Sequence, residues 1–209
     1  MVDVLFKNSS YVATDLKDTL YEIMDGAGGE RIQPGARVLI KPNFLIPAAP
    51  ERAITTHPLV VKAVVEYVLD KGAKPVVADS PGMGSFEKIL RKGEYLDATG
   101  GLDVVFRPFR ESVSVDIGEP FGVISLAREA LQSDMVINLA KLKTHAQMLL
   151  TMGVKNMFGC VIGLKKPEWH LKAGRDRAIF GRLLVQICRA VSPAITIVDG
   201  IAALEGQGP

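Results

Sequence analysis

The sequence predicts an α/β domain with a mostly parallel β-sheet and helices on both of its faces. Short, almost uninterrupted apolar runs alternate with stretches of helical periodicity, as expected for parallel strands buried on both sides. The chain of 209 residues is 48% hydrophobic and 23% charged, which is enough for a sizeable core. It contains no internal repeat, low-complexity tract or clear linker, so we expect residues 1–209 to form a single domain.

The first elements follow from apolar periodicity and from the placement of glycine and proline. Residues 37–41 (RVLIK) predict a strand that ends at Pro42. The next helix has Pro58 in its first turn and stops at Gly72, after the apolar stretch LVVKAVVEYVL. Before both of them, a helix that stops at Gly26 has an apolar face made of Leu16, Leu20, Ile23 and Met24.

The middle of the chain continues the alternation. Residues 76–79 (VVAD) predict a buried strand, and a short helix capped by Ser85 follows it. Residues 102–106 (LDVVF) predict a third strand. After a polar, loop-like stretch, we expect a helix over residues 124–132 and a strand over residues 135–139 that leads into KLKTH.

The last helix has the clearest amphipathic pattern. Ser192-Pro193 ends it, and residues 194–200 (AITIVDG) predict one more strand. No helix follows that strand, so we expect the domain to be truncated at its C-terminal side. The apolar face of the last helix is formed by Ile179, Leu183, Leu184, Ile187, Cys188 and Val191.

Composition and charge argue against several classes of protein. The net charge is +2 and the basic residues are scattered, which disfavours nucleic acid as a partner. The chain has neither a signal peptide nor an apolar run long enough to span a membrane, so we expect a cytoplasmic protein without a membrane partner. Cys160 and Cys188 form no cluster motif, so this chain is not expected to ligate an iron–sulfur cluster.

Polar residues recur where the predicted strands end. Ligands of open α/β sheets bind at this carboxyl edge, so we expect a binding site there. Lys141, Lys143 and His145 are spaced by two, so they project to one side if the strand stays extended. For each residue alone, turn chemistry or a solvated strand end is the alternative. The other strand ends contribute Lys41, Asn43, Asp79, Ser80 and Asp199.

Two further segments carry candidate ligand-binding groups. Thr56 and His57 precede a helix N-terminus, where they either bind an anion or simply cap the helix. Lys155 and Asn156 lie in GVKNMFGCVIG, whose glycines either let backbone amides approach an anion or allow tight packing. A desolvated lysine serves as a base or covalent tether, and histidine transfers protons near neutral pH. We therefore predict His145 and Lys155 as catalytic residues.

Several motifs together resemble the domain of unknown function family 362. They are VLIKPN, TTHP, ADSPG, DMVINLAKLKTH and GVKNMFG, and the resemblance runs from about Val38 to the C-terminus. Members are often fused to ferredoxin-type cluster modules or described as iron–sulfur proteins. The resemblance therefore implies a possible ferredoxin-type partner, although the cluster cysteines are absent from this chain.

A fainter resemblance is to the nickel-pincer lactate racemase family. In that family a histidine precedes, by ten residues, the lysine that tethers a nickel cofactor, and His145 and Lys155 have this separation. The resemblance implies His170, fifteen residues further on, as a metal ligand, and a nickel-type or other metal cofactor. This chain has Asp79-Ser80-Pro81-Gly82 in place of the family's other acid–base histidine, which disfavours lactate racemisation.

Two functional hypotheses remain open from the sequence. The first is an enzyme or cofactor-dependent protein that binds a small anionic ligand, a carboxylate or a phosphate, at the carboxyl edge of the sheet. The alternative is a non-catalytic accessory module associated with iron–sulfur or ferredoxin redox partners.

Overall fold

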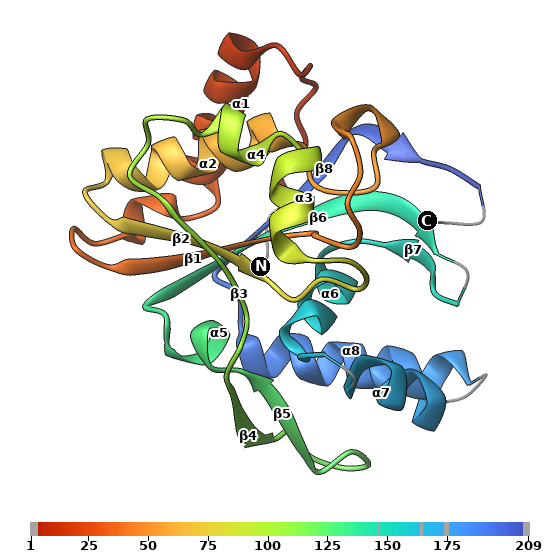
Figure 1. Ribbon diagram of the computed structural model, residues 1–209. Coiled ribbons are helices and arrows are strands. Elements are labelled where there is room, and N and C mark those ends of the chain that lie inside the picture. Colours follow the sequence, from red (N-terminus) through yellow and green to blue (C-terminus); the bar gives the residue numbers. More distant parts are fainter. Residues whose placement is uncertain (1–3, 146, 164, 174–175, 207–209) are drawn as a thin grey trace.

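The protein, in a computed structural model, is built around a six-stranded sheet with helices on both faces (Figure 1). The structure describes residues 4–145, 147–163, 165–173 and 176–206. The strands run in the order β3-β2-β1-β6-β7, and β8 also pairs with β6. They are β1 (Arg37–Pro42), β2 (Lys74–Asp79), β3 (Val105–Pro108), β6 (Met135–His145), β7 (Leu149–Thr151) and β8 (Ile195–Leu204).

The sheet is mostly parallel, which confirms the predicted fold class. In the central strand β1, Leu39 lies opposite Val76 of β2 and Val136 of β6, and both pairings are parallel. The pairings of β2 with β3 and of β6 with β8 are parallel as well. Only β7 runs antiparallel to β6, and it pairs with residues 143–145, beyond the end of β1.

One face of the sheet is covered by α1 (Ala13–Gly26), α2 (Pro58–Asp70), α3 (Phe86–Lys92) and α4 (Tyr95–Ala98). Helix α2 starts as predicted, with Pro58 at its first position, and the His57 side chain accepts a hydrogen bond from the Leu59 amide. Two short 3₁₀ turns, η1 (Gly29–Arg31) and η2 (Pro50–Arg52), lie in the loops of this half.

The opposite face is covered mainly by α8 (Arg177–Val191), whose N-terminus is capped by the Asp176 carboxylate. Leu183, Leu184 and Ile187 of its predicted apolar face are buried, whereas Ile179 is 40% exposed. Three shorter helical elements pack beside α8: α6 (Gly153–Asn156), η3 (Met157–Cys160) and α7 (Lys165–Ala173).

The stretch between β3 and β6 differs from the sequence prediction. The helix expected over residues 124–132 begins only at Arg128, as α5 (Arg128–Gln132). Residues before it form β5 (Val123–Ala127), which pairs antiparallel with β4 (Ser112–Asp116). The polar stretch therefore contains β4, the first strand of a hairpin whose second strand is β5. In β5 the buried residues Ile124 and Leu126 are two positions apart, which is the spacing expected for one face of a strand.

Two other boundaries also differ. Strand β6 continues to His145 rather than ending at Leu139, and β3 begins at Val105 rather than at residue 102. The stretch KKPEWHLKA, for which no helix is predicted from the sequence, is the helix α7. Within the described part of the chain, no helix has the length and apolar character needed to cross a membrane.

Candidate functional site

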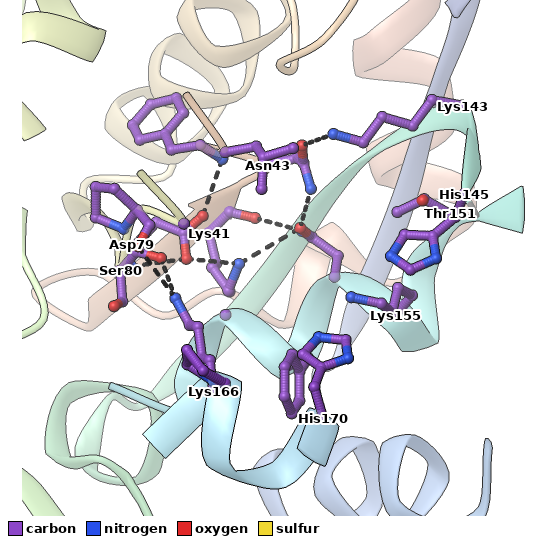
Figure 2. Close-up of a pocket in the computed structure, with 18 of the residues that line it drawn as sticks. Lys41, Asn43, Asp79, Ser80, Lys143, His145, Thr151, Lys155, Lys166 and His170 are labelled. Carbon is purple, nitrogen blue, oxygen red and sulfur yellow. Dashed lines mark hydrogen bonds and ion pairs between the residues drawn. The ribbon is translucent and has the colours of Figure 1, made fainter. Parts of the chain in front are cut away.

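A cavity of about 550 Å³ opens at the carboxyl edge of the parallel strands (Figure 2). Six of the residues singled out in the sequence line it, although they come from β1, the loop after it, β2, β6 and α6. They are Lys41, Asn43, Asp79, Lys143, His145 and Lys155. Ser80 and Asn156, also expected at the site, belong to the same lining.

The floor of the cavity is a buried ion pair between Lys41 and Asp79. The Lys41 Nζ lies 2.9 Å from Asp79 Oδ1, and both side chains are almost completely buried. The same carboxylate accepts hydrogen bonds from the Phe44 and Ser80 amides. Lys41 also donates to the Pro42 carbonyl and, at 3.4 Å, to Asn156 Oδ1. Both charges are thus satisfied within the protein, which leaves neither group free to hold a ligand.

Gly159 of η3 is packed directly against this ion pair. A Cβ atom at this position would lie 2.5 Å from both Asp79 Oδ1 and Lys41 Nζ, closer than such atoms approach in proteins. A Cβ atom added to Gly153 would likewise lie only 2.6 Å from Thr196 Cγ2 of β8. These two glycines of GVKNMFGCVIG therefore serve close packing, one of the two interpretations of the segment.

Asn43 and Asn156 connect the ion pair to Lys143 at the end of β6. Asn43 Nδ2 donates to Asn156 Oδ1, and Asn43 Oδ1 accepts from Lys143 Nζ at 2.7 Å. Lys143 also donates to the Ile54 carbonyl. Burial, followed by the charge of Lys155, lowers the pKa of Lys143 to about 7. Its protonated amine has three N–H groups, so one of them remains for a ligand.

Among the four lysines that line the cavity, Lys155 on α6 has the fewest partners. Its Nζ makes no hydrogen bond or ion pair with any described residue, and lies 5.0 Å from the centroid of the Phe158 ring. Burial lowers its pKa to about 8, with further contributions from Lys166 and Lys41. A substantial fraction of this amine is consequently neutral and nucleophilic at slightly alkaline pH.

His145 lies beside Lys155 in the cavity wall (Figure 2). Its Nδ1 accepts hydrogen bonds of 3.1 Å from the Gln147 and Met148 amides, so in the neutral ring the proton is on Nε2. Burial, together with the charge of Lys155, lowers the pKa of His145 to about 4. At neutral pH this histidine is therefore uncharged, with an N–H donor at Nε2 and no lone pair there.

Helix α7 brings Lys166 and His170 into the same cavity. Lys166 donates to the carbonyls of Ser80 and Pro81, and burial lowers its pKa to about 8. Lys166 is not among the predicted site residues, because no helix is predicted from the sequence in its segment. A helical interpretation would have placed Lys166 and His170 four residues apart on one face, which is the signal that was available.

Four of the residues expected at the site, Thr56, His57, Lys141 and Asp199, do not line the cavity. Thr56 Oγ1 is occupied by the Asn43 amide and the Leu139 carbonyl. His57 caps α2 and stacks on Tyr11 with 3.7 Å between ring centroids. These placements favour the capping alternative for the helix N-terminus. Thr56 acts indirectly, because its hydroxyl accepts a hydrogen bond from the backbone amide of Asn43, which lines the cavity.

Lys141 belongs to a second buried cluster. Its Nζ lies 2.8 Å from Asp199 Oδ2 and 2.8 Å from the Tyr11 hydroxyl, which itself donates to Asp199. The expectation that Lys141, Lys143 and His145 converge was therefore wrong for Lys141. The register of β6 with β8 places Lys141 opposite Asp199, and the two side chains form an ion pair outside the cavity.

His170 is the residue that we expected to bind a metal. Its Nδ1 lies 3.0 Å from Oε1 of the Gln147 side chain. This oxygen only accepts hydrogen bonds, so Nδ1 carries the proton and Nε2 of the neutral ring has a lone pair. Among the described residues there is no group of three or more His, Cys, Asp or Glu side chains that could hold a metal ion. A metal at His170 would therefore need most of its ligands from a cofactor rather than from these side chains.

The fold and the site together define an α/β protein with a lysine-rich cavity at the carboxyl edge of its sheet. The chain belongs to the family described as "Domain of unknown function (DUF362)", whose model matches residues 38–209. This match confirms the resemblance seen in the motifs.

Two known proteins are similar to this chain. The thylakoid-associated protein sll1697 of Synechocystis is 42% identical over 207 residues, which cover 98% of this chain and 64% of that protein. The solved structure of the lactate racemase apoprotein from Thermoanaerobacterium thermosaccharolyticum superimposes with a TM-score of 0.56 at 13% identity. That match covers 91% of this chain and 50% of the other, and it shows a shared fold.

Proposed function

We propose that the cavity binds a small anion, a carboxylate or a phosphate, and that Lys155 and His145 act on it. The observation that carries this proposal is an imbalance of charge in the cavity wall. Among the described residues, four lysines line the cavity with a single carboxylate, Asp79, which is already paired with Lys41. Lys143, Lys155 and Lys166 have no ion-pair partner among the described residues. An anion supplies the missing negative charge.

The donors available to the anion lie on three different elements. Lys143 and His145 come from β6, Lys155 from α6, and Lys166 from α7. The neutral His145 contributes its Nε2–H, and the unpartnered Lys155 contributes every N–H of its ammonium group. In its neutral form the same lysine is a nucleophile or a base. Binding and chemistry are thus assigned to one set of residues.

Thermal unfolding with added anions tests the proposal. Sulfate, phosphate and acetate are expected to raise the midpoint with concentration, since a ligand at 100 times its Kd stabilises by about 2.7 kcal/mol. Lys166→Met should weaken the effect of sulfate. Lys172→Met is the matched control, because Lys172 lies on the same helix but pairs with Glu168 outside the cavity. An unchanged midpoint with all three anions would refute the proposal.

Protein purified from its own host can show whether the chain is a cofactor-dependent enzyme or an accessory module. We propose the enzyme, since Lys155 offers an unpaired amine and His170 a lone pair in one cavity. Intact mass spectrometry and metal analysis should then find an adduct on Lys155 or a retained metal. Anion binding with neither of these, and without turnover, would support an accessory module with a redox partner.

Anion affinity should depend on pH in a defined direction. At pH 6 Lys143, Lys155 and Lys166 are protonated, and above about 8 the last two lose their charge. Binding of sulfate, whose own charge is constant, should therefore weaken roughly tenfold or more between pH 6 and 9. Calorimetric titration measures this directly. Lys155→Met should flatten the profile, and affinity that rises with pH would contradict the assignment.

Lys155 should matter for the ligand and not for folding. Its amine has no partner to lose among the described residues, so we expect Lys155→Met to change the free energy of unfolding by less than about 1 kcal/mol. Leu184→Ala, which opens a cavity in the α8 core, should cost roughly 2 to 5 kcal/mol. Urea unfolding compares the two variants. Equal destabilisation by both would show that Lys155 is a structural residue.

A further inference from the structure

We infer that Lys155 forms an imine with the carbonyl carbon of a small 2-oxo acid whose carboxylate is held by the neighbouring cationic groups. This inference rests on the proposed function, because it names the class of anion and the bond that the site makes. Three features of the cavity lead to it: the state of the Lys155 amine, the donors around it and the apolar part of the wall.

The first feature is the lack of partners around the Lys155 amine. No described residue accepts a hydrogen bond from Nζ, which is half-buried and lies 5.0 and 5.8 Å from the centroids of the Phe158 and Phe180 rings. Lys41 in the same cavity has the opposite environment, with three oxygen partners. An amine without hydrogen bonds, near other cations, is the arrangement that activates a lysine as a nucleophile toward carbonyl groups.

The second feature is that groups nearby can hold a carboxylate next to the reacting carbonyl. Lys143 and Lys166 each keep an N–H that their described acceptors leave unused, and His145 has its proton on Nε2. An isolated aldehyde or ketone would leave these donors without a partner. A 2-oxo acid carries its carboxylate on the atom adjacent to the carbonyl carbon, so one ligand satisfies both needs.

The third feature is the mixed chemistry of the wall. Phe44, Leu45, Phe158 and Pro167 line the cavity beside the lysines. Its volume of about 550 Å³ is far more than a phosphate ion fills, and leaves room for an organic side chain. An apolar wall opposite a cationic cluster is suited to a carboxylate that carries a carbon skeleton.

The step balances without any further reactant. The neutral Nζ of Lys155 attacks the carbonyl carbon, and the C–O π bond breaks to give a carbinolamine. The two protons of the amine leave with the former carbonyl oxygen as water, while a C=N bond replaces the C=O bond. Lys143, with its unused N–H, gives one proton to the departing oxygen and takes up one of the two amine protons from Nζ, so its own protonation state is restored. The step involves no change of oxidation state.

Borohydride trapping with pyruvate tests the inference. The intact protein is incubated with pyruvate and sodium borohydride near pH 8, and the mass and modified peptide are determined. One reduced adduct per chain is expected on Lys155, together with near-complete loss of trapping in Lys155→Met. Lys172→Met, which alters an exposed lysine outside the cavity, should be labelled like the unmodified sequence. Sulfate should protect Lys155 by competing for the cavity.

Lactate separates this inference from the proposed function, because it has the carboxylate of pyruvate but no carbonyl. If lactate and pyruvate both raise the thermal midpoint and no adduct forms on Lys155, the anion site stands and the imine is refuted. If neither of them raises it and no adduct forms, both proposals fall. Labelling that persists in Lys155→Met, or that spreads equally over surface lysines, also overturns the imine.

Discussion

Asp79→Ala is expected to destabilise the protein by about 3 to 5 kcal/mol, because it leaves the Lys41 ammonium buried without its counter-charge. The Phe44 and Ser80 amides lose their acceptor in the same step. Since Lys41 and Asp79 also form the floor of the cavity, the variant leaves an uncompensated positive charge there, and sulfate affinity should rise. Urea unfolding and calorimetric titration measure the two effects.

Two further variants test whether the loss of stability comes from the uncompensated buried charge. Glu22→Ala breaks a lysine–carboxylate pair of 2.6 Å that is exposed, and should cost less than about 1 kcal/mol. The double change Lys41→Met with Asp79→Ala removes both charges and should recover much of the stability lost in the single variant. If the double variant is no more stable than Asp79→Ala, the loss comes from the Phe44 and Ser80 amides, which are left without an acceptor, rather than from the uncompensated charge.

The sequence predicted the sheet and the general position of the cavity because both depend on local signals. Apolar runs with turn residues at their ends mark parallel strands, and their carboxyl ends meet at one edge. Lys41, Asp79 and Lys143 follow three such runs and are neighbours in the structure. The spacing of two also placed Lys143 and His145 correctly, since β6 stays extended to His145.

The errors arose where tertiary partners decide the outcome. Lys141 has the same local pattern as Lys143, and only the register of β8 reveals that Asp199 neutralises it. Lys166 was missed because α7 is short and mostly polar, so its sequence shows no clear helical pattern. The position of this helix depends on its packing against α8. The β4–β5 hairpin was missed because its alternation spans five residues, a length at which strand and helix patterns overlap.

The tautomers of the two histidines also could not be predicted from the sequence. Their separations from Lys155 brought both histidines to attention, His145 as a catalytic residue and His170 as a metal ligand. In the structure Nδ1 of His145 accepts from backbone amides, whereas Nδ1 of His170 donates to a side-chain carbonyl. The two rings therefore have opposite hydrogen-bonding capacity at Nε2, a donor on His145 and an acceptor on His170. Only the hydrogen-bond partners, which come from distant backbone and side-chain atoms, distinguish their roles.

The second buried ion pair gives a prediction with an equally large effect on stability. Asp199→Ala leaves Lys141 buried beside Tyr11 without a counter-charge and should destabilise the protein by about 3 to 5 kcal/mol. It also removes the acceptor of the Tyr11 hydroxyl and of the His57 amide, which hold the N-terminal segment and the start of α2 against β8. Urea unfolding measures the loss, and Lys141→Met added to Asp199→Ala should reverse part of it.

Sulfate affinity distinguishes the two buried pairs. Neither Lys141 nor Asp199 lines the cavity, so Asp199→Ala, measured at a temperature where it is folded, should bind sulfate within about twofold of the unmodified protein. Asp79→Ala should lose stability but bind sulfate more tightly, because it leaves Lys41 unpaired in the cavity. If Asp199→Ala abolished sulfate binding while its fold persisted, the Tyr11, Lys141 and Asp199 cluster would be part of the binding site. The sequence-based assignment of Lys141 to the ligand would then be correct, against its placement in the structure.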